Sequence, residues 1–216
     1  MKSSKSFLAA IAFLLACALQ ANAAHVDFND PRRALGREDD IRIDAQLLQE
    51  TVSSGSPLNV TWQVENLTGN AIAVADKVAD VSYDADASTI ELSIGSEIPT
   101  GDVMPHLTVI APGQKKVFSS AAVVRVVAAG GRGPLASFPR FVTIKVNVLR
   151  DVSPFATLVQ EQAQARLGAA PVKLPDALFD RWVESNDAIF LNPLPVAWSG
   201  ETKTTAAEAR RPMGTF

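Results

Sequence analysis

The chain has 216 residues, of which 47% are hydrophobic, 20% charged and 6% aromatic. This length and composition allow a single domain with a sizeable apolar core. The formal net charge of −3 gives the chain no reason to approach phosphate backbones, so we expect no nucleic-acid partner.

The first 23 residues have the three parts of a secretory signal peptide. Lys2 and Lys5 supply positive charge, residues 7–19 form an apolar run, and residues 21–23 (Ala-Asn-Ala) place small residues at a cleavage site. A membrane span needs about 20 apolar residues, so this run is too short for one. We therefore expect a periplasmic or secreted protein that begins near Ala24, with no transmembrane span in its mature form.

Residues 14–17 (Leu-Leu-Ala-Cys) offer a second interpretation of the leader, because they resemble the lipobox of bacterial lipoproteins. Cys17 would then carry a lipid anchor and become the first mature residue. Leu15 is not the preferred residue at its position in that box, and a good cleavage site follows, so we favour the free product. Cys17 is the only cysteine; the mature chain then has no disulfide, and its stability depends on its core.

Alternation of apolar and polar residues begins at residue 41, after a polar segment (24–40) that we interpret as a loosely held N-terminal arm. Such alternation, or a run of β-branched residues, predicts half-buried strands. The predicted strands lie at 41–47, 58–65, 72–74, 79–83, 89–94, 107–110, 117–127 and 142–148. Turn residues separate them, which is typical of a two-layer sandwich.

The C-terminal part changes to helical periodicity. Ser153 followed by Pro154 predicts a helix start, and an apolar stripe continues to residue 167, where Gly168 can end the helix. A second helix is predicted over 175–185, and then an extended segment in which two prolines exclude a central strand. The expected organisation is a signal peptide (1–23), an arm (24–40), a β-sandwich domain (41–151), a helical C-terminal subdomain (152–198) and a disordered tail (199–216).

Two short stretches resemble bacterial extracellular immunoglobulin-like modules. They are residues 60–66 (Val-Thr-Trp-Gln-Val-Glu-Asn) and residues 110–118 (Ile-Ala-Pro-Gly-Gln-Lys-Lys-Val-Phe). The similarity covers residues 41–150 and lacks the Cys…Trp…Cys spacing of antibody domains. It implies a mainly β fold, an immunoglobulin-like antiparallel β-sandwich of seven or eight strands, here with a C-terminal two-helix extension. A fold of this kind does not fix a function.

Two groups of residues were considered as metal ligands. Asp84, Asp86 and Ser88 have the alternate spacing that starts many calcium loops, but Thr89 and Gly95 stand where an EF-hand needs glycine and glutamate. We favour a hairpin whose aspartates cap turn amides, and keep these three residues as the metal candidates.

Met104 and His106 could bind copper through a thioether and an imidazole. The chain offers few other soft ligands, so we interpret His106 as a loop histidine that precedes a strand. We expect no cofactor.

Catalytic chemistry has no recognisable motif in this chain, which lacks a Gly-x-Ser-x-Gly elbow. We therefore predict no catalytic residues and favour a non-enzymatic protein. Two alternatives stay open. One is an envelope hydrolase that uses loop carboxylates around Asp84, Asp86 and Asp102, and the other is a secreted protease inhibitor that presents the loop 130–137.

Aromatic residues gather C-terminal to the predicted sandwich, and we expect the two helices to pack on that sandwich themselves. The alternative is that part of this surface docks a protein partner in the cell envelope. The candidate partner-binding residues are then Phe179, Trp182, Phe190 and Trp198. Together these observations predict an exported binding or envelope-assembly protein.

Mass spectrometry of the chain after expression in a bacterium tests the leader. We expect a mature protein that begins at Ala24, because the small residues at 21 and 23 fit signal peptidase. The mass of a lipidated chain that begins at Cys17 would contradict this prediction.

Overall fold

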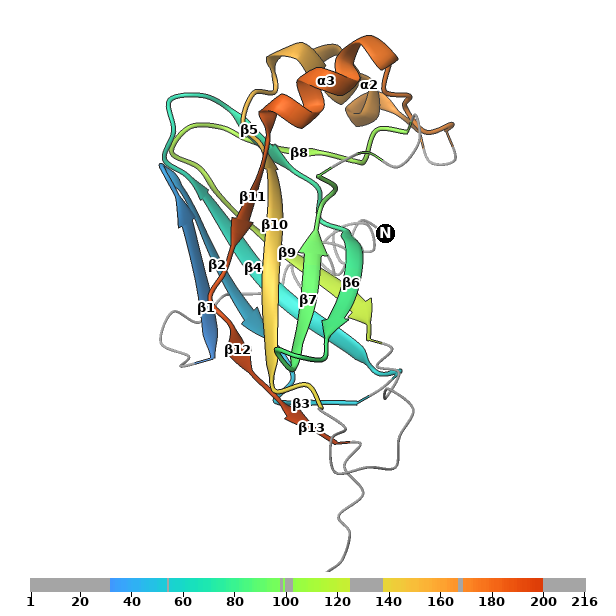
Figure 1. Ribbon diagram of the computed structural model, residues 1–216. Coiled ribbons are helices and arrows are strands. Elements are labelled where there is room, and N and C mark those ends of the chain that lie inside the picture. The colour runs from blue at the N-terminus through green and yellow to red at the C-terminus, as the bar shows by residue number, and fades with distance from the viewer. Residues whose placement is uncertain are drawn as a thin grey trace, which may run out of the picture.

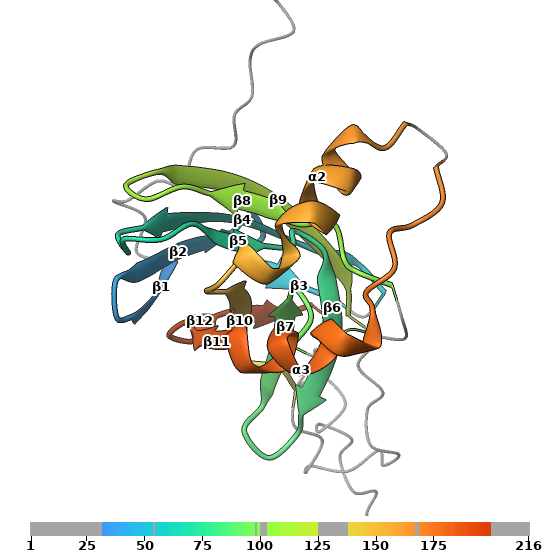
Figure 2. The ribbon, with the colours of Figure 1, turned by 90° about the horizontal axis from the view of Figure 1, so that it is seen from above.

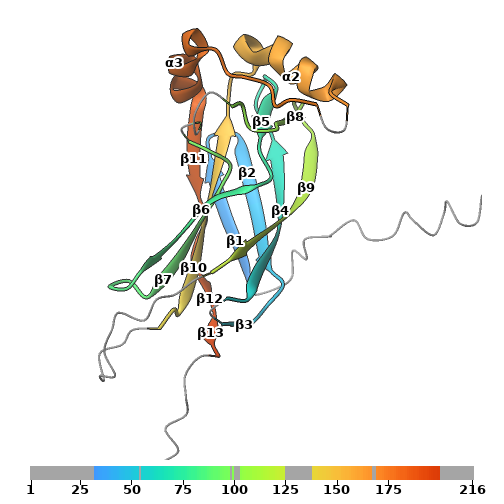
Figure 3. The same cartoon turned by 90° about the vertical axis from the view of Figure 1, so that its right-hand side faces the viewer.

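The strands form two facing sheets, and two short helices cover one end of them (Figures 1 and 3). The computed structural model describes residues 32–53, 55–97, 99, 103–124, 138–166 and 169–199. The predicted signal peptide and residues 200–216 of the predicted tail lie outside these residues. Within them the chain is mainly β, as the alternating pattern predicted.

The first sheet has four antiparallel strands in the order β1-β2-β4-β9. They are β1 (Arg33–Glu38), β2 (Ile41–Leu47), β4 (Pro57–Asn66) and β9 (Lys115–Val123). β4 is the longest of them and pairs with β2 on one side and β9 on the other. Three of these four strands were predicted from the sequence.

The second sheet has the order β6-β7-β10-β5-β8, and two more strands, β11 and β12, pair with β10. Its members are β5 (Ile72–Val74), β6 (Val78–Asp84), β7 (Thr89–Ile94), β8 (Thr108–Ile110), β10 (Phe141–Leu149), β11 (Asn186–Phe190) and β12 (Leu194–Pro195). β10 is the centre of this sheet because it pairs with four other strands.

The pairing of β7 with β10 departs from the predicted antiparallel arrangement. The two strands run parallel, from Thr89 opposite Phe141 to Ile94 opposite Val146. Parallel neighbours need a crossover connection, and here the chain between them passes through β8 and then through β9 of the other sheet. A second parallel pair joins β3 (Thr51–Val52) to β13 (Ala197–Trp198).

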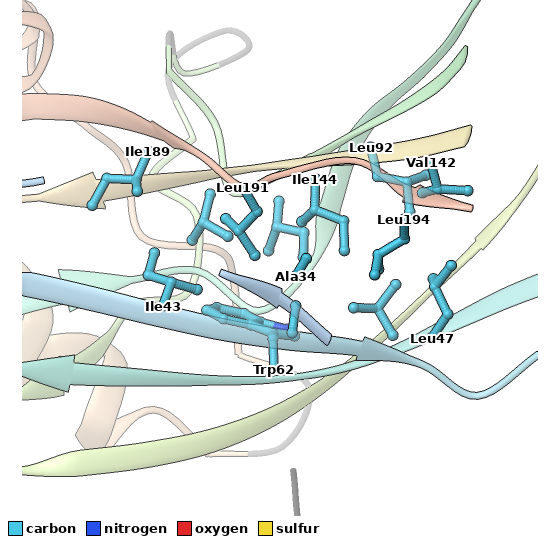
Figure 4. Packing of buried hydrophobic residues seen from close by; sticks show 14 of the residues in the cluster. Ala34, Ile43, Leu47, Trp62, Leu92, Val142, Ile144, Ile189, Leu191 and Leu194 are labelled. Atoms are coloured by element: carbon cyan, nitrogen blue, oxygen red, sulfur yellow. The ribbon is translucent and has the colours of Figure 1, made fainter. Parts of the chain in front are cut away.

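Apolar side chains of the two sheets meet in a core between them (Figure 4). Trp62 of β4 is completely buried, and its ring stacks on Phe118 of β9 with 4.5 Å between ring centroids. Ile144 and Val146 of β10 are completely buried in the opposite layer. The prediction that these alternating rows exclude water between two layers is confirmed.

Strand β1 lies where the sequence indicated a loosely held arm. It pairs with β2 along its whole length. Its buried positions are Ala34 and Gly36, which are too small to give an apolar signal. A Cβ on Gly36 would lie 2.8 Å from the carbonyl oxygen of Phe190 and 3.0 Å from Cδ1 of Leu191. The close approach of the chain after β11 therefore requires small residues here.

The segment that follows β11 closes one side of the structure against β1. The backbone N–H of Asn192 donates to the carbonyl oxygen of Leu35 at 3.1 Å, and its side-chain oxygen accepts the N–H of Leu35. The first sheet thus continues into the second, and the strands form a half-barrel (Figure 2). Residues 186–198, which the sequence placed in a helical subdomain, belong to the sheets, and Pro195 lies in a two-residue strand at one end of β10.

Two helices connect β10 to β11 and cover the end of the half-barrel (Figure 2). A short 3₁₀ turn (Ser153–Phe155) leads into α2 (Ala156–Gln164), and α3 (Asp176–Ser185) continues directly into β11. Ser153 makes no side-chain cap; instead its N–H donates to the carboxylate of Asp151. Phe155 and Trp182 are buried in edge-to-face contact, with 5.6 Å between ring centroids. The expectation that the helices pack on the sandwich is confirmed for these two rings.

Asn66, at the end of β4, joins the two sheets through a completely buried amide side chain. Its Nδ2 donates to the carbonyl oxygens of Asn70 at 2.8 Å and of Ile110 at 2.9 Å. Its Oδ1 accepts the N–H and the hydroxyl of Thr68 at 3.0 and 2.7 Å. The backbone of Asn66 also bonds to the turn at 111–114, because its oxygen accepts the N–H of Gly113 at 2.7 Å. All the amide's donors and acceptors are thus used within the protein.

Ser120 of β9 makes a second polar link between the sheets. The indole N–H of Trp62 donates to the Ser120 hydroxyl at 3.0 Å, and that hydroxyl donates to the carbonyl oxygen of Asp76. Asp76 follows β5, so the link runs from the first sheet to the second. Burying an indole requires a partner for its N–H, and Ser120 supplies it.

Replacing Asn66 by Asp tests the link at the end of β4. The substitution keeps the shape, removes both Nδ2 donors and places a carboxylate in a fully buried site, so we expect unfolding free energy to fall by about 3 kcal/mol. Asn70→Asp is the matched control, because the Asn70 side chain is exposed, and it should change stability by less than about 0.5 kcal/mol. Urea denaturation followed by circular dichroism measures both, and equal losses would contradict the assignment.

Candidate functional site

A pocket of about 340 Å³ lies beside α2, where three segments of the chain meet. The first segment follows β5, the second precedes β8, and the third is the end of α2 with the chain that leads on toward α3. The described residues that line the pocket are Ala75, Lys77, Val103, Met104, Pro105, His106, Gln162, Ala165, Arg166, Ala169, Ala170, Pro171 and Val172. This volume lies at the lower end of the range of small-molecule sites, about 300–1,000 Å³.

Gln162 of α2 fixes the segment before β8 in place. Its Nε2 donates to the carbonyl oxygens of Pro105 at 2.9 Å and Met104 at 3.3 Å. Its Oε1 accepts the N–H of Leu107 at 3.2 Å. One side chain thus satisfies three backbone groups of an irregular segment, which otherwise would need water.

The chain after α2 is tied to the same segment. The N–H of Met104 donates to the carbonyl oxygen of Val172 at 3.0 Å, and Val103 forms an isolated β-bridge with Lys173. The segment before β8 and the chain of α2 and beyond are therefore joined to each other by hydrogen bonds, which holds two of the three segments that line the pocket together.

The interior of the pocket is apolar. Ala75, Met104 and Val172 are each at most 8% exposed. Ala75 and Met104 also belong to the second apolar cluster of the protein, which surrounds Phe155 and Trp182 beneath the helices. A ligand in the pocket would thus contact the same packing that holds the helices on the sheets.

Three basic side chains, of Lys77, His106 and Arg166, lie around this apolar interior, and all three residues are exposed. The described lining contains no aspartate or glutamate. Within the described ranges none of the three takes part in an ion pair. The described lining therefore combines apolar surface with basic residues.

The metal candidates lie in the turn between β6 and β7, away from the pocket lining. The carboxylate of Asp84 accepts the N–H groups of Asp86 at 2.9 Å and Ala87 at 3.0 Å. The interpretation that this aspartate caps turn amides is confirmed. Among the residues with described placement, no three His, Cys, Asp or Glu side chains are close enough to hold a metal ion.

Met104 and His106, considered above as a copper pair, both line the pocket. Met104 is 3% exposed and packs in the second apolar cluster. His106 is exposed and precedes β8 (Thr108–Ile110), as the interpretation of a loop histidine before a strand required.

The four candidate partner-binding residues lie in different environments. Trp182 is 2% exposed, and Trp198 is half-buried with its ring stacked near Phe138 at 6.4 Å. Phe179 of α3 is 37% exposed, and Phe190 of β11 is 60% exposed. Their partner-binding role stays a prediction, and only the last two present much ring surface to solvent.

Several candidates from the sequence fall outside the described residues. They are Cys17, Asp102 and the loop at 130–137. The described pocket carries basic rather than acidic side chains, whereas the hydrolase alternative calls for carboxylates in a concave site.

Comparison with family models, with curated proteins and with solved structures gives no match. Among the helices of the described ranges, none has both the length and the apolar character needed to cross a membrane. The argument about function therefore depends on the pocket.

Sequence reasoning missed this pocket. Lys77, His106 and Arg166 come from three distant segments, and no spacing rule connects them. Gln162 shows the difficulty. It is a polar residue on a short helix, and its hydrogen-bond partners are backbone groups far away in the sequence.

Replacing Asp84 by Ala tests the capping role against the metal hypothesis. Loss of two hydrogen bonds in an exposed turn should lower the unfolding free energy by about 1 kcal/mol, with or without calcium. Asp86→Ala is the control and should have little effect, because Asp86 contributes its backbone N–H to the turn and alanine retains that group. A calcium-dependent rise in melting temperature that both substitutions abolish would contradict the prediction and indicate a metal site.

Proposed function

We propose that this chain is an exported, non-enzymatic binding protein that holds a small ligand in the pocket beside α2. The single observation that carries the proposal is a pocket of about 340 Å³ with an apolar interior and two wall segments that are joined by hydrogen bonds. Small-molecule sites are concave, mostly apolar and largely formed in advance, with a few polar groups that orient the ligand.

The location in the periplasm or outside the cell is part of this proposal, and the leader at 1–23 supports it. A binding protein in that compartment must fold without disulfides if cleavage removes Cys17. The two facing sheets provide an apolar core of the required size, because 25 buried hydrophobic residues form a single cluster.

We also propose an immunoglobulin-like relationship for the sandwich. The two stretches that carry the resemblance are in contact, since Asn66 bonds to Ile110 through its side chain and to Gly113 and Gln114 through its backbone. This contact gives a physical reason why an asparagine at a strand end and a Pro-Gly turn occur together. The parallel pairing of β7 with β10 departs from a Greek key of antiparallel strands, so the contact between the two stretches is what supports the proposal.

The proposal is tested by titrating the isotope-labelled mature protein with octan-1-ol, octanoate and octylammonium. These probes share one eight-carbon chain and differ in charge. We expect at least one of them to shift the backbone amide signals of Met104, His106 and Val172 in nuclear magnetic resonance spectra. Apolar burial of the chain provides the affinity, at about 0.8 kcal/mol per methylene group.

Filling the pocket provides the decisive variant. Ala170 lines the pocket and is exposed, so Ala170→Trp should block binding without disturbing the core. Ala163→Trp is the matched control, because Ala163 is an exposed residue of α2 outside the lining, and it should retain binding. Failure of all three probes to shift these signals, or shifts that persist in Ala170→Trp, would overturn the proposal.

A further inference from the structure

We infer that the pocket selects ligands that carry a single anionic group on an apolar body, such as a medium-chain carboxylate. The inference rests on the proposed function and specifies the chemical class of the ligand. It follows from the basic residues of the described lining and from the engagement of Gln162 and of the Met104 N–H within the wall.

The three basic side chains reach the pocket from three separate parts of the fold. Lys77 lies between β5 and β6, His106 precedes β8, and Arg166 follows α2. The described lining contains the cationic residues Lys77 and Arg166 and no acidic residue, so its formal charge is positive. A concave apolar site concentrates such a field and attracts a charge of opposite sign.

Several basic residues elsewhere in the described structure have acidic partners. Arg150 contacts Glu38, Asp39 and Asp187. Likewise, Lys115 pairs with Glu65 at 3.0 Å, and Lys145 pairs with Glu97 at 3.4 Å. Within the described residues, no ion pair involves the three basic residues of the pocket lining, so no salt bridge there competes with a ligand.

Two polar groups of the lining are already engaged within the protein. Gln162 uses its Nε2 and Oε1 within the wall, and the N–H of Met104 is bonded to Val172. Lys77, His106 and Arg166 are therefore the polar side chains of the described lining that can meet a ligand head group, while Ala75 and Met104 offer apolar contact.

Lys77 gives the sharpest test among the three. Arg166 follows the C-terminal end of α2, where a cation also interacts favourably with the helix dipole. Lys77 has no such helix beside it in sequence, so a helix-dipole effect does not complicate the interpretation of its substitution. Loss of its charge should change ligand affinity more than it changes the stability of the fold.

The same three eight-carbon probes rank the head groups. We expect octanoate to bind about tenfold more tightly than octan-1-ol, and octylammonium to bind most weakly, since each partly exposed charge contact contributes on the order of 1 kcal/mol. Raising the salt concentration should weaken the binding of octanoate and leave the affinity for octan-1-ol unchanged, because mobile ions screen exposed charges.

Three variants assign the selectivity to the rim. Lys77→Gln and Arg166→Gln should each lower the affinity for octanoate about threefold to tenfold and leave the affinity for octan-1-ol unchanged. Lys116→Gln removes an exposed lysine of β9 outside the lining and should leave both affinities unchanged. Circular dichroism and melting temperature establish that each variant is folded.

The outcomes separate this inference from the proposed function. Equal affinity for octanoate and octan-1-ol, or an octanoate affinity that Lys77→Gln and Arg166→Gln do not change, overturns the inference while the pocket still binds ligands. Absence of binding by all three probes overturns the proposed function and the inference with it.

Discussion

The fold depends on joining two apolar sheets at a point where polar backbone must cross between them. Asn66 meets this constraint. Its amide is completely buried, yet it satisfies the carbonyl oxygens of Asn70 and Ile110 and accepts two bonds from Thr68. Buried backbone groups without partners are costly, so an asparagine here lets the chain turn from β4 toward the second sheet while the core stays dry.

The helices that frame the pocket are an insertion between two paired strands. β10 and β11 are antiparallel neighbours, and the 36 residues that connect them, 150–185, include both helices. The base of this insertion is closed by the bond from the N–H of Arg150 to the carbonyl oxygen of Ser185 at 2.7 Å, and by the ion pair of Arg150 with Asp187. Because both ends of the insertion are anchored in the central strand pair, the sheet determines where α2 can lie.

Alternation predicted the strands well wherever large apolar residues occupy the buried positions. β2, β4, β7 and β10 were all predicted within one or two residues, since Ile, Leu, Val and Trp mark their inward faces. β1 was missed because Ala34 and Gly36 fill the inward positions, and the reason for small residues lies in Leu191, more than 150 residues away. The parallel pairing of β7 with β10 was missed for a similar reason, because side-chain alternation gives the face of a strand but not its neighbour.

The pocket illustrates a different limit. The prediction of two helices says nothing about the segment before β8, yet the hydrogen bonds of Gln162 all go to backbone groups of that segment. The sequence drew attention to Met104 and His106 as an alternative copper pair, and both residues line the pocket. The missing information was three-dimensional, namely that Lys77 and Arg166 lie on the same pocket as His106.

A ligand in this pocket would act on the stability of the whole chain. Ala75 comes from the end of β5, Met104 from the segment before β8, and Ala165 from the end of α2, so a single bound molecule bridges the sheet and its helical cap. A ligand that binds only the assembled pocket stabilises the folded state by RT ln(1 + [L]/Kd), about 2.7 kcal/mol at one hundred times Kd. In the proposed binding role, occupancy of the pocket would add to the stability that the apolar core supplies and would oppose local unfolding of the helical cap.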